Sequence, residues 1–217
     1  MVTAVRLRYP FSGRWLVQNS PADRVPSHGT RRFGTAYAID FVPVDARGRS
    51  APLTMRSLLR PQAAETFTGF GRPILAPGPG VVVATHDGEP DHDAYRGVAS
   101  VGYALTQPRR VARGWVGLSG NHVILRVRPG VLVALCHLRR GSVAVTTGQR
   151  LAGGEVVGQC GNSGNSTEPH LHLQAVDRLD IDRAIGLPVS FPPGLPRNGT
   201  VIDVPDVPRR PEVTSRP

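Results

Sequence analysis

The segment GNSGNSTEPHLHL, from Gly161 to Leu173, combines a turn with the beginning of a strand. Its first half, rich in Gly, Asn and Ser, has the composition of a turn and does not favour regular structure. Pro169 then disfavours helical backbone at the residue before it, and the Leu/His alternation that follows has the two-residue period of a β-strand. Because side chains two apart on a strand share a face, we expect His170 and His172 to lie side by side. Two imidazoles in this arrangement indicate a metal site or a proton-transfer site.

The composition favours many short strands. The chain has 217 residues, a length that fits one main domain with a good-sized core, and it contains 25 Gly and 21 Pro. Short runs of Val, Leu and Ile alternate with Gly- and Pro-containing turns, which predicts a mainly β architecture. No apolar run is long enough to span a bilayer, and the first ten residues lack the apolar region of a secretory signal peptide. Localisation is left open at this point.

The positive charge of the chain does not identify a partner by itself. The formal charge of +10 comes from 26 basic residues that are all Arg. These residues are scattered, with pairs such as Arg31-Arg32 and Arg109-Arg110, and no nucleic-acid-binding motif accompanies them, so we expect no nucleic-acid partner. The absence of Lys from the sequence also excludes a biotinyl or lipoyl carrier, which needs a Lys to modify.

The expected elements follow from the alternation of apolar runs and turns. Besides the strand after Pro169, we expect one or two strands within residues 1–20, and strands at residues 36–42, 74–76, 81–84, 121–127, 131–138, 142–145 and 155–158. Residues 45–70 are interpreted as an insertion with a short helix at 53–59. The acidic residues 87–93 are interpreted as a solvated hairpin loop, and residues 109–120 as a further loop. The main domain is expected to span residues 1–191. The Pro-rich tail, 192–217, is expected to lie outside the core, draped on the surface or disordered.

Asp40 lies inside one of the expected strands, between an Ile and a Phe. A carboxylate in that position is rarely there for solubility, because a buried charge is costly unless it is paired or bound to a metal. A catalytic zinc site takes three N or O ligands from the protein and keeps a position for water. The chain offers five candidates at strand ends or next to turns: His28, Asp40, His137, His170 and His172.

The two cysteines, Cys136 and Cys160, form neither a disulfide framework nor a Cys-x-x-Cys metal motif. We expect buried free thiols. A disulfide between them is the less favoured alternative.

Four segments together resemble the lysostaphin- and LytM-type zinc metallopeptidases, which cut peptide cross-links in bacterial peptidoglycan. Residues 161–172 are similar to the final His-x-His motif of that family and its Gly/Asn/Ser lead-in, and residues 136–138 are similar to its x-His-Leu element. Residues 37–41 resemble its Asp-bearing strand, and residues 71–82 its central strand-turn-strand. The resemblance implies a fold with an antiparallel β-sheet or barrel-sandwich core of the lysostaphin-like, duplicated hybrid motif type, with loop insertions.

The same resemblance implies roles for the five candidates. His28, Asp40 and His172 would hold one Zn²⁺ per chain, while His137 and His170 would act on the substrate and the attacking water, in an order that is left open. The motif formed by His28 and Asp40 departs from the pattern of the family, in which the commonest form of this motif is His-x-x-x-Asp. Here twelve positions separate His28 from Asp40, which implies a longer loop.

The implied activity is zinc-dependent hydrolysis of peptide bonds, with peptidoglycan cross-links as the expected substrate, at the cell wall or otherwise outside the cytoplasm. No HExxH motif occurs, so a thermolysin-like Glu base is absent from the sequence. The turn around Ser163 misses the nucleophile-elbow pattern at its last position and leads to a strand, which argues against a Ser hydrolase of that type. The alternative is an inactive family member that binds cell-wall peptide or a partner hydrolase.

Overall fold

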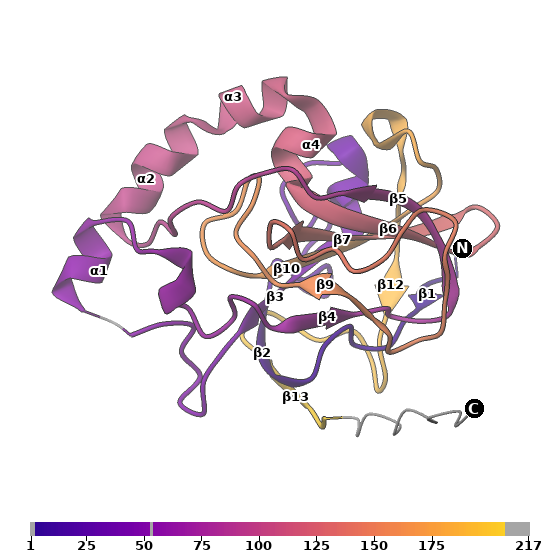
Figure 1. Cartoon of the computed structure of the whole chain (residues 1–217), viewed down its shortest axis with the longest axis horizontal. Coiled ribbons are helices and arrows are strands. Elements are labelled where there is room, and N and C mark those ends of the chain that lie inside the picture. The colour runs from indigo at the N-terminus through magenta and orange to yellow at the C-terminus, as the bar shows by residue number, and fades with distance from the viewer. Residues whose placement is uncertain (1–2, 53, 207–217) are drawn as a thin grey trace, which may run out of the picture.

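A single long antiparallel sheet organises the molecule. The structure is a computed structural model that describes residues 3–52 and 54–206. In the described part of the chain, the strand order of this sheet is β13-β2-β3-β10-β7-β6-β5-β8, with β11 also pairing with β10. Two further pairs lie outside it: β4 with β9, antiparallel, and β1 with β12, parallel. The mainly antiparallel β class predicted from the sequence is confirmed (Figure 1).

The strands have the following bounds: β1 Val5–Arg6, β2 Gly13–Gln18, β3 Ile39–Pro43, β4 Pro73–Leu75, β5 Gly80–His86, β6 Asn121–Arg128, β7 Val131–Leu138, β8 Arg150–Leu151, β9 Val156–Gln159, β10 Leu171–Val176, β11 Gly186–Leu187, β12 Val189–Ser190 and β13 Val201–Val204. The α-helices are α1 Met55–Leu59, α2 Val98–Leu105, α3 Gln107–Ala112 and α4 Gly114–Ser119. Three short 3₁₀ segments are η1 Arg32–Tyr37, η2 Ala64–Thr66 and η3 Ile181–Arg183.

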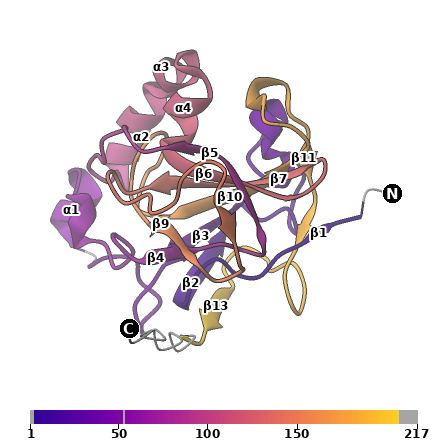
Figure 2. The same ribbon diagram turned by 45° about the vertical axis from the view of Figure 1, so that its right-hand side comes forward.

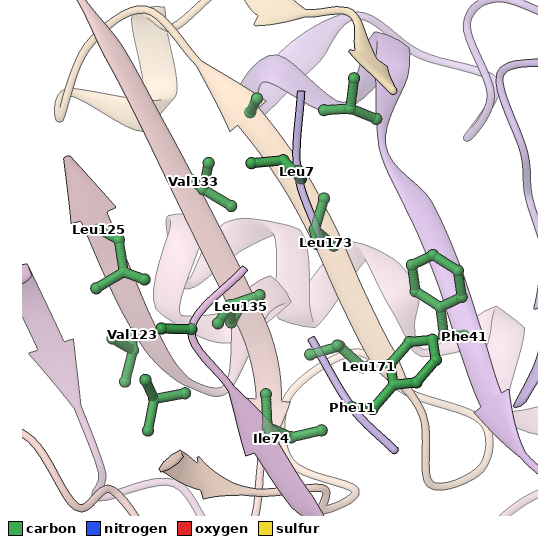
Figure 3. Close-up of a cluster of buried hydrophobic side chains, with 14 of the residues drawn as sticks. Leu7, Phe11, Phe41, Ile74, Val123, Leu125, Val133, Leu135, Leu171 and Leu173 are labelled. Carbon is green, nitrogen blue, oxygen red and sulfur yellow. The ribbon is translucent and has the colours of Figure 1, made fainter. Parts of the chain in front are cut away.

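The main core lies between one face of the long sheet and the β4–β9 pair. Alternate residues of the central strands point into it, among them Leu135 of β7 and Leu171 and Leu173 of β10, all fully buried. Ile74 of β4 contributes from the opposite side (Figure 3). Each such aliphatic side chain stabilises the fold by ~1.5–3 kcal/mol through burial. Because Leu171 and Leu173 point into this core, His172 between them must point to the opposite face of the sheet.

The other face of the sheet is covered by a smaller apolar cluster and by helices. Ile124, Ala134, Cys136 and Val176 from the central strands are buried there. Trp115, together with Leu118 of α4, packs against them. Figure 2 shows α2, α3 and α4 following one another over this side of the molecule. This is also the face toward which His172 points.

The expected strands are found with shifted ends, except the one expected at residues 142–145, where the structure has no strand. β7 has the bounds predicted for residues 131–138, and β10 follows Pro169 as expected. The strand expected at 36–42 begins only at Ile39, because Ala36 and Tyr37 belong to η1. In η1, Phe33 and Gly34 have left-handed backbone, with φ of 56° and 71°.

The expectation of a loop over residues 109–120 is wrong. Residues 107–112 and 114–119 form α3 and α4, and α2 precedes them. Pro108 suits the first turn of α3, since its missing N–H has no helical partner there. Each helix is too short to be stable alone, so the packing of Trp115 and the hydrogen bonds of Arg110 hold this region.

The insertion and the tail differ in how they attach. Within residues 45–70 the structure has α1 and η2, and a small separate cluster of Ala51, Phe67 and Ala94. The start of the helix expected at 53–59 includes residue 53, which lies outside the described residues. Part of the tail is paired, contrary to expectation, since β13 is an edge strand beside β2. The tail residues 207–217 lie outside the described residues, and the division at 191 stays a prediction.

None of the helices in the described ranges has the length and apolar character that a membrane crossing requires.

The pairing of β13 gives a stability prediction. Ile202 faces the core, whereas Asp203 next to it is exposed. We expect Ile202→Ala to lower the free energy of unfolding by about 1–2 kcal/mol, because it removes apolar contacts and leaves a gap beside Trp15. Asp203→Ala is the control and should change it by less than about 0.5 kcal/mol. Urea unfolding of both variants measures this. Equal stability of the two variants would contradict the pairing.

Candidate metal and catalytic site

The register of the central strands places Asp40 beside His172. β10 pairs with β3 so that His172 lies opposite Asp40, and with β7 so that it lies opposite Cys136. Residues opposite each other in an antiparallel pair share a face, so the carboxylate and the imidazole point the same way. That face is opposite to the one that carries Leu171 and Leu173. His172 Nδ1 is 2.9 Å from Asp40 Oδ1.

His28 reaches the same carboxylate from the loop between β2 and β3. Ser27 anchors this loop, because its N–H donates to Ala36 O at 3.0 Å and its hydroxyl donates to Ala38 O at 2.7 Å. The chain therefore folds back before it enters β3. His28 Nε2 lies 3.1 Å from Asp40 Oδ2. The spacing of twelve positions between the two residues is bridged by this fold-back.

Three donor atoms from three segments converge. One atom each from His28, Asp40 and His172 lies within 4.8 Å of the other two. Within residues 3–52 and 54–206, no other group of three His, Cys, Asp or Glu side chains meets this condition. Two imidazole nitrogens and a carboxylate oxygen form a donor set that suits zinc and related divalent metals. The residues fit a metal ion.

The ring nitrogens of His28 and His172 that point away from Asp40 have their own hydrogen-bond partners. His28 Nδ1 donates to Ser27 Oγ at 3.0 Å, and His172 Nε2 donates to Gln174 Oε1 at 3.0 Å. The Gln174 amide in turn donates to Phe33 O at 2.8 Å, which fixes its orientation. The inner nitrogens, His28 Nε2 and His172 Nδ1, are left facing the carboxylate. Such outer contacts set the tautomer and the direction of a ligating imidazole.

His137 is aimed by a distortion of β7. Its φ is +62°, rare for a residue with a side chain, and the β6–β7 register shifts between Asn121 and Val123. Such a bulge redirects a side chain out of the normal alternation. The His137 ring lies 4.6 Å from that of His170, and its Nδ1 donates to Ser163 O at 2.8 Å. The tautomer thus leaves Nε2 as an acceptor.

His170 lies just before β10 and has a similar hydrogen-bonding pattern. Its Nδ1 donates to Glu168 O at 2.8 Å and is 2.9 Å from Ser166 Oγ. Its Nε2 is 3.8 Å from Asp40 Oδ1. Both candidate catalytic histidines therefore use Nδ1 to hold their position and leave Nε2 for other partners.

The charges in the site keep the carboxylate ionised and one imidazole neutral. Burial alone would raise the pKa of Asp40, but the charges of His28 and His170 and the hydrogen bonds of His172 and His28 hold it well below its usual range. Burial lowers the pKa of His172, yet the hydrogen bond and charge of Asp40 raise it overall. Burial, together with the charges of His170 and His172, holds the pKa of His137 well below its usual range. His137 is therefore a neutral imidazole at neutral pH.

The acidic segment at residues 87–93, which precedes α2, holds the turn that contains Asn162 and Ser163. Asp91 accepts the N–H of Asn162 at 2.7 Å and that of Arg140 at 2.9 Å. The Asn162 amide donates to His92 O at 2.8 Å. Residues 87–93 form a solvent-accessible loop, as expected, and the structure adds that Asp91 in this loop binds backbone amides. These contacts hold in place the turn that contains Ser163.

The five predicted residues line a cleft of about 470 Å³. One side of the cleft is lined by the loop that carries His28 and by η1, and the other by α2, α3 and α4. The residues on these two sides include Thr30, Arg32, Phe33, Tyr103, Gln107, Arg110, Trp115 and Leu118. The helices that sequence reasoning missed therefore form a wall of the cleft.

Asn19 is a further site residue that sequence reasoning missed. It has a φ of +49°, lines the cleft, and donates from its side-chain amide to Asp40 Oδ2 at 2.7 Å. Nothing in the sequence around it signals this role, since an Asn after a strand is typical of an ordinary turn.

The sequence matches the model of peptidase family M23 over residues 62–182, which is more than half of the chain. The chain belongs to peptidase family M23. The matched region of this M23 chain contains His137, His170 and His172. His28 and Asp40 precede it, and only the fold brings them to the same cleft.

Solved structures with a similar chain path include other M23 proteins. The catalytic domain of the prophage-encoded M23 protein EnpA from Enterococcus faecalis is 16% identical, with a TM-score of 0.41 over 70% of this chain and 73% of that one. The catalytic domain of lysostaphin from Staphylococcus simulans is 18% identical, with a TM-score of 0.39 over 69% and 74%. A putative M23 peptidase from Pseudomonas aeruginosa is 18% identical, with a TM-score of 0.43 over 85% and 50%. The search of curated proteins gave no match.

The cysteines of this M23 chain lie near the site without forming part of it. Cys136 and Cys160 are both free and buried, as favoured from the sequence. Burial raises the pKa of both thiols far above the usual range, so neither is a nucleophile at neutral pH.

The contact between Gln174 and His172 gives a prediction for metal binding. We expect Gln174→Ala to weaken Zn²⁺ binding by about 10- to 100-fold, because His172 loses the acceptor that orients it. Gln174→Glu keeps an acceptor for His172 and should lose less Zn²⁺ affinity. Gln149→Ala, at an exposed position, is the control and should keep the wild-type affinity. Competition with a chelating dye measures the affinity, and circular dichroism checks the fold. A folded Gln174→Ala protein with unchanged affinity would refute the role of this residue.

Proposed function

We propose that this M23 chain is a zinc-dependent endopeptidase that hydrolyses peptide bonds in peptidoglycan cross-links. The observation that carries the proposal is the convergence of His28, Asp40 and His172 in one cleft, beside His137 and His170. Membership of a peptidase family supports the hydrolysis of peptide bonds as the reaction.

His28, Asp40 and His172 would hold the metal. Two neutral imidazoles and one carboxylate leave a bound Zn²⁺ with a net positive charge, and three protein ligands are the number found in catalytic zinc sites. Zinc, when bound, supplies a Lewis acid that polarises a carbonyl group and makes a coordinated water more acidic. Asn19 and the outer partners of the two imidazoles keep the donors in place.

His137 and His170 would act on the substrate. His137 is neutral at neutral pH and presents Nε2 toward the cleft, so it can accept a proton from the attacking water. His170 presents its Nε2 from the neighbouring ring, 4.6 Å away between centroids. A protonated His170 in this place would donate a hydrogen bond to a carbonyl oxygen as negative charge develops on it. The division of these two roles is part of the proposal.

An inactive binding protein is the alternative function. A degenerate family member would lack ligands or catalytic groups, whereas here all five side chains are present and lie together. The arrangement supports the enzyme over the binding protein.

The proposal predicts separate effects of metal ligands and catalytic histidines. We expect about one zinc per chain in purified protein, and removal by a chelator to abolish release of amino groups from purified peptidoglycan. His137→Ala and His170→Ala should each lower turnover by ~10²-fold or more while zinc content stays near wild type. His172→Ala should lose the zinc itself.

The control is His86→Ala, because His86 lies outside the cleft and should retain both zinc and turnover. Elemental analysis and the hydrolysis assay are run on the same preparations. Loss of zinc in the His170 variant would make that residue a ligand. A zinc-loaded wild-type protein that releases no amino groups would overturn the proposed activity.

A further inference from the structure

The charge in the cleft is unevenly distributed. Among the residues that line it, Asp40 is the one carboxylate, and it is fully engaged by its imidazole and amide partners. Two arginines, Arg32 and Arg110, line the same cleft. The two sides that flank the candidate metal site therefore carry positive charge without a matching negative charge.

The guanidinium of Arg110 is held by hydrogen bonds within the protein. Its Nε donates to Asn165 Oδ1 at 2.6 Å, and its two terminal nitrogens donate to Thr106 Oγ1 at 2.7 Å and Tyr103 O at 2.8 Å. The guanidinium also lies 3.8 Å from the centre of the Tyr103 ring. With these contacts Arg110 ties α2 and α3 to the turn before β10. Arg110 therefore stabilises this side of the cleft, and few of its N–H donors are left for a ligand.

Arg32 differs from Arg110 in having a free guanidinium. Its side chain is exposed and lies over the Phe33 ring, 5.1 Å from the ring centre. Within residues 3–52 and 54–206, no carboxylate and no hydrogen-bond acceptor contacts this guanidinium. Its backbone N–H donates to Thr30 Oγ1 at 3.1 Å. The head group is thus available at the edge of the cleft.

The backbone under Arg32 is held rigidly. The Thr35 hydroxyl donates to Thr30 O and Arg32 O, at 3.1 and 3.0 Å. Gly34 has a φ of +71°, and a Cβ there would lie 2.5 Å from a methyl carbon of Val176, so only glycine fits. Arg32 therefore keeps a fixed position relative to β10 and the metal ligands on the sheet.

We propose that Arg32 binds a free carboxylate of the substrate, so that the enzyme prefers acidic peptides over uncharged ones. This inference rests on the proposed function and adds the substrate class. A guanidinium presents two parallel N–H donors that match the two oxygens of a carboxylate, and it is always charged. An uncharged peptide offers this group only carbonyl oxygens. The discrimination should appear mainly in KM, because Arg32 lies away from the reacting atoms.

The test compares two forms of one substrate. Purified peptidoglycan is made soluble with a glycosidase, and its carboxylates are either left free or converted to amides with ammonia and a carbodiimide. We expect wild-type protein to favour the free form by about tenfold in kcat/KM at low salt, and less at high salt. Arg32→Gln should lower kcat/KM for the free form and remove most of the preference. Arg31→Gln, next to it but outside the cleft lining, is the matched control and should keep the preference.

A binding measurement separates this inference from the proposed function. Fluorescence anisotropy of labelled fragments with the zinc-loaded His137→Ala variant, which should bind without rapid cleavage, should show tighter binding of the free form, and this difference should be lost when Arg32→Gln is added. If wild-type protein cuts both forms equally, or if Arg32→Gln keeps the preference, the role of Arg32 is overturned and the peptidase activity stands. If neither form is cut, the proposed activity fails, and the anisotropy alone decides the role of Arg32.

Discussion

Asp40 is a carboxylate buried on the central sheet, and the site depends on the interactions that keep it ionised there. Removing a carboxylate from water costs several kcal/mol unless its oxygens are paired. Both oxygens are paired here: Oδ1 with His172, and Oδ2 with His28 and the Asn19 amide. These partners come from β10, from the loop before β3 and from the end of β2, so the carboxylate joins three segments. The register between β3 and β10 decides which way His172 points, because a shift of one residue would turn this side chain toward the apolar core.

The other elements around the site serve to aim side chains at this centre. The bulge in β7 turns His137 toward the cleft, and the turn before β10 supplies the carbonyl that fixes its tautomer. Asp91 holds that turn by accepting backbone N–H groups from both sides. Left-handed backbone at a residue with a side chain is costly and persists where the surrounding contacts enforce it. The conformation of His137 is such a case, since the hydrogen bond from its ring to Ser163 O compensates for it.

The strands and the His-x-His pair could be predicted from the sequence because their signal is local: apolar runs between turns, and a period of two after Pro169. His28 could be placed only through the family resemblance, because the fold-back that joins it to Asp40 depends on contacts of Ser27 that no local pattern reveals. The helices α2 to α4 were missed since glycines and a proline interrupt them, and tertiary packing decides their structure. β13 was missed for a related reason: four residues after a Pro-rich run form a strand only where the edge of β2 is free to receive them.

The long spacing between His28 and Asp40 gives one loop three tasks. The loop presents the His28 imidazole to the carboxylate. Its Phe33 carbonyl accepts from the Gln174 amide, and Gln174 in turn orients His172. It also carries Arg32 at the edge of the cleft. A three-residue spacing would leave no room for the second and third tasks. Because the same short, rigid backbone fixes all of them, a carboxylate held by Arg32 would brace the segment that orients two of the three metal ligands, which joins substrate recognition to the geometry of the metal site.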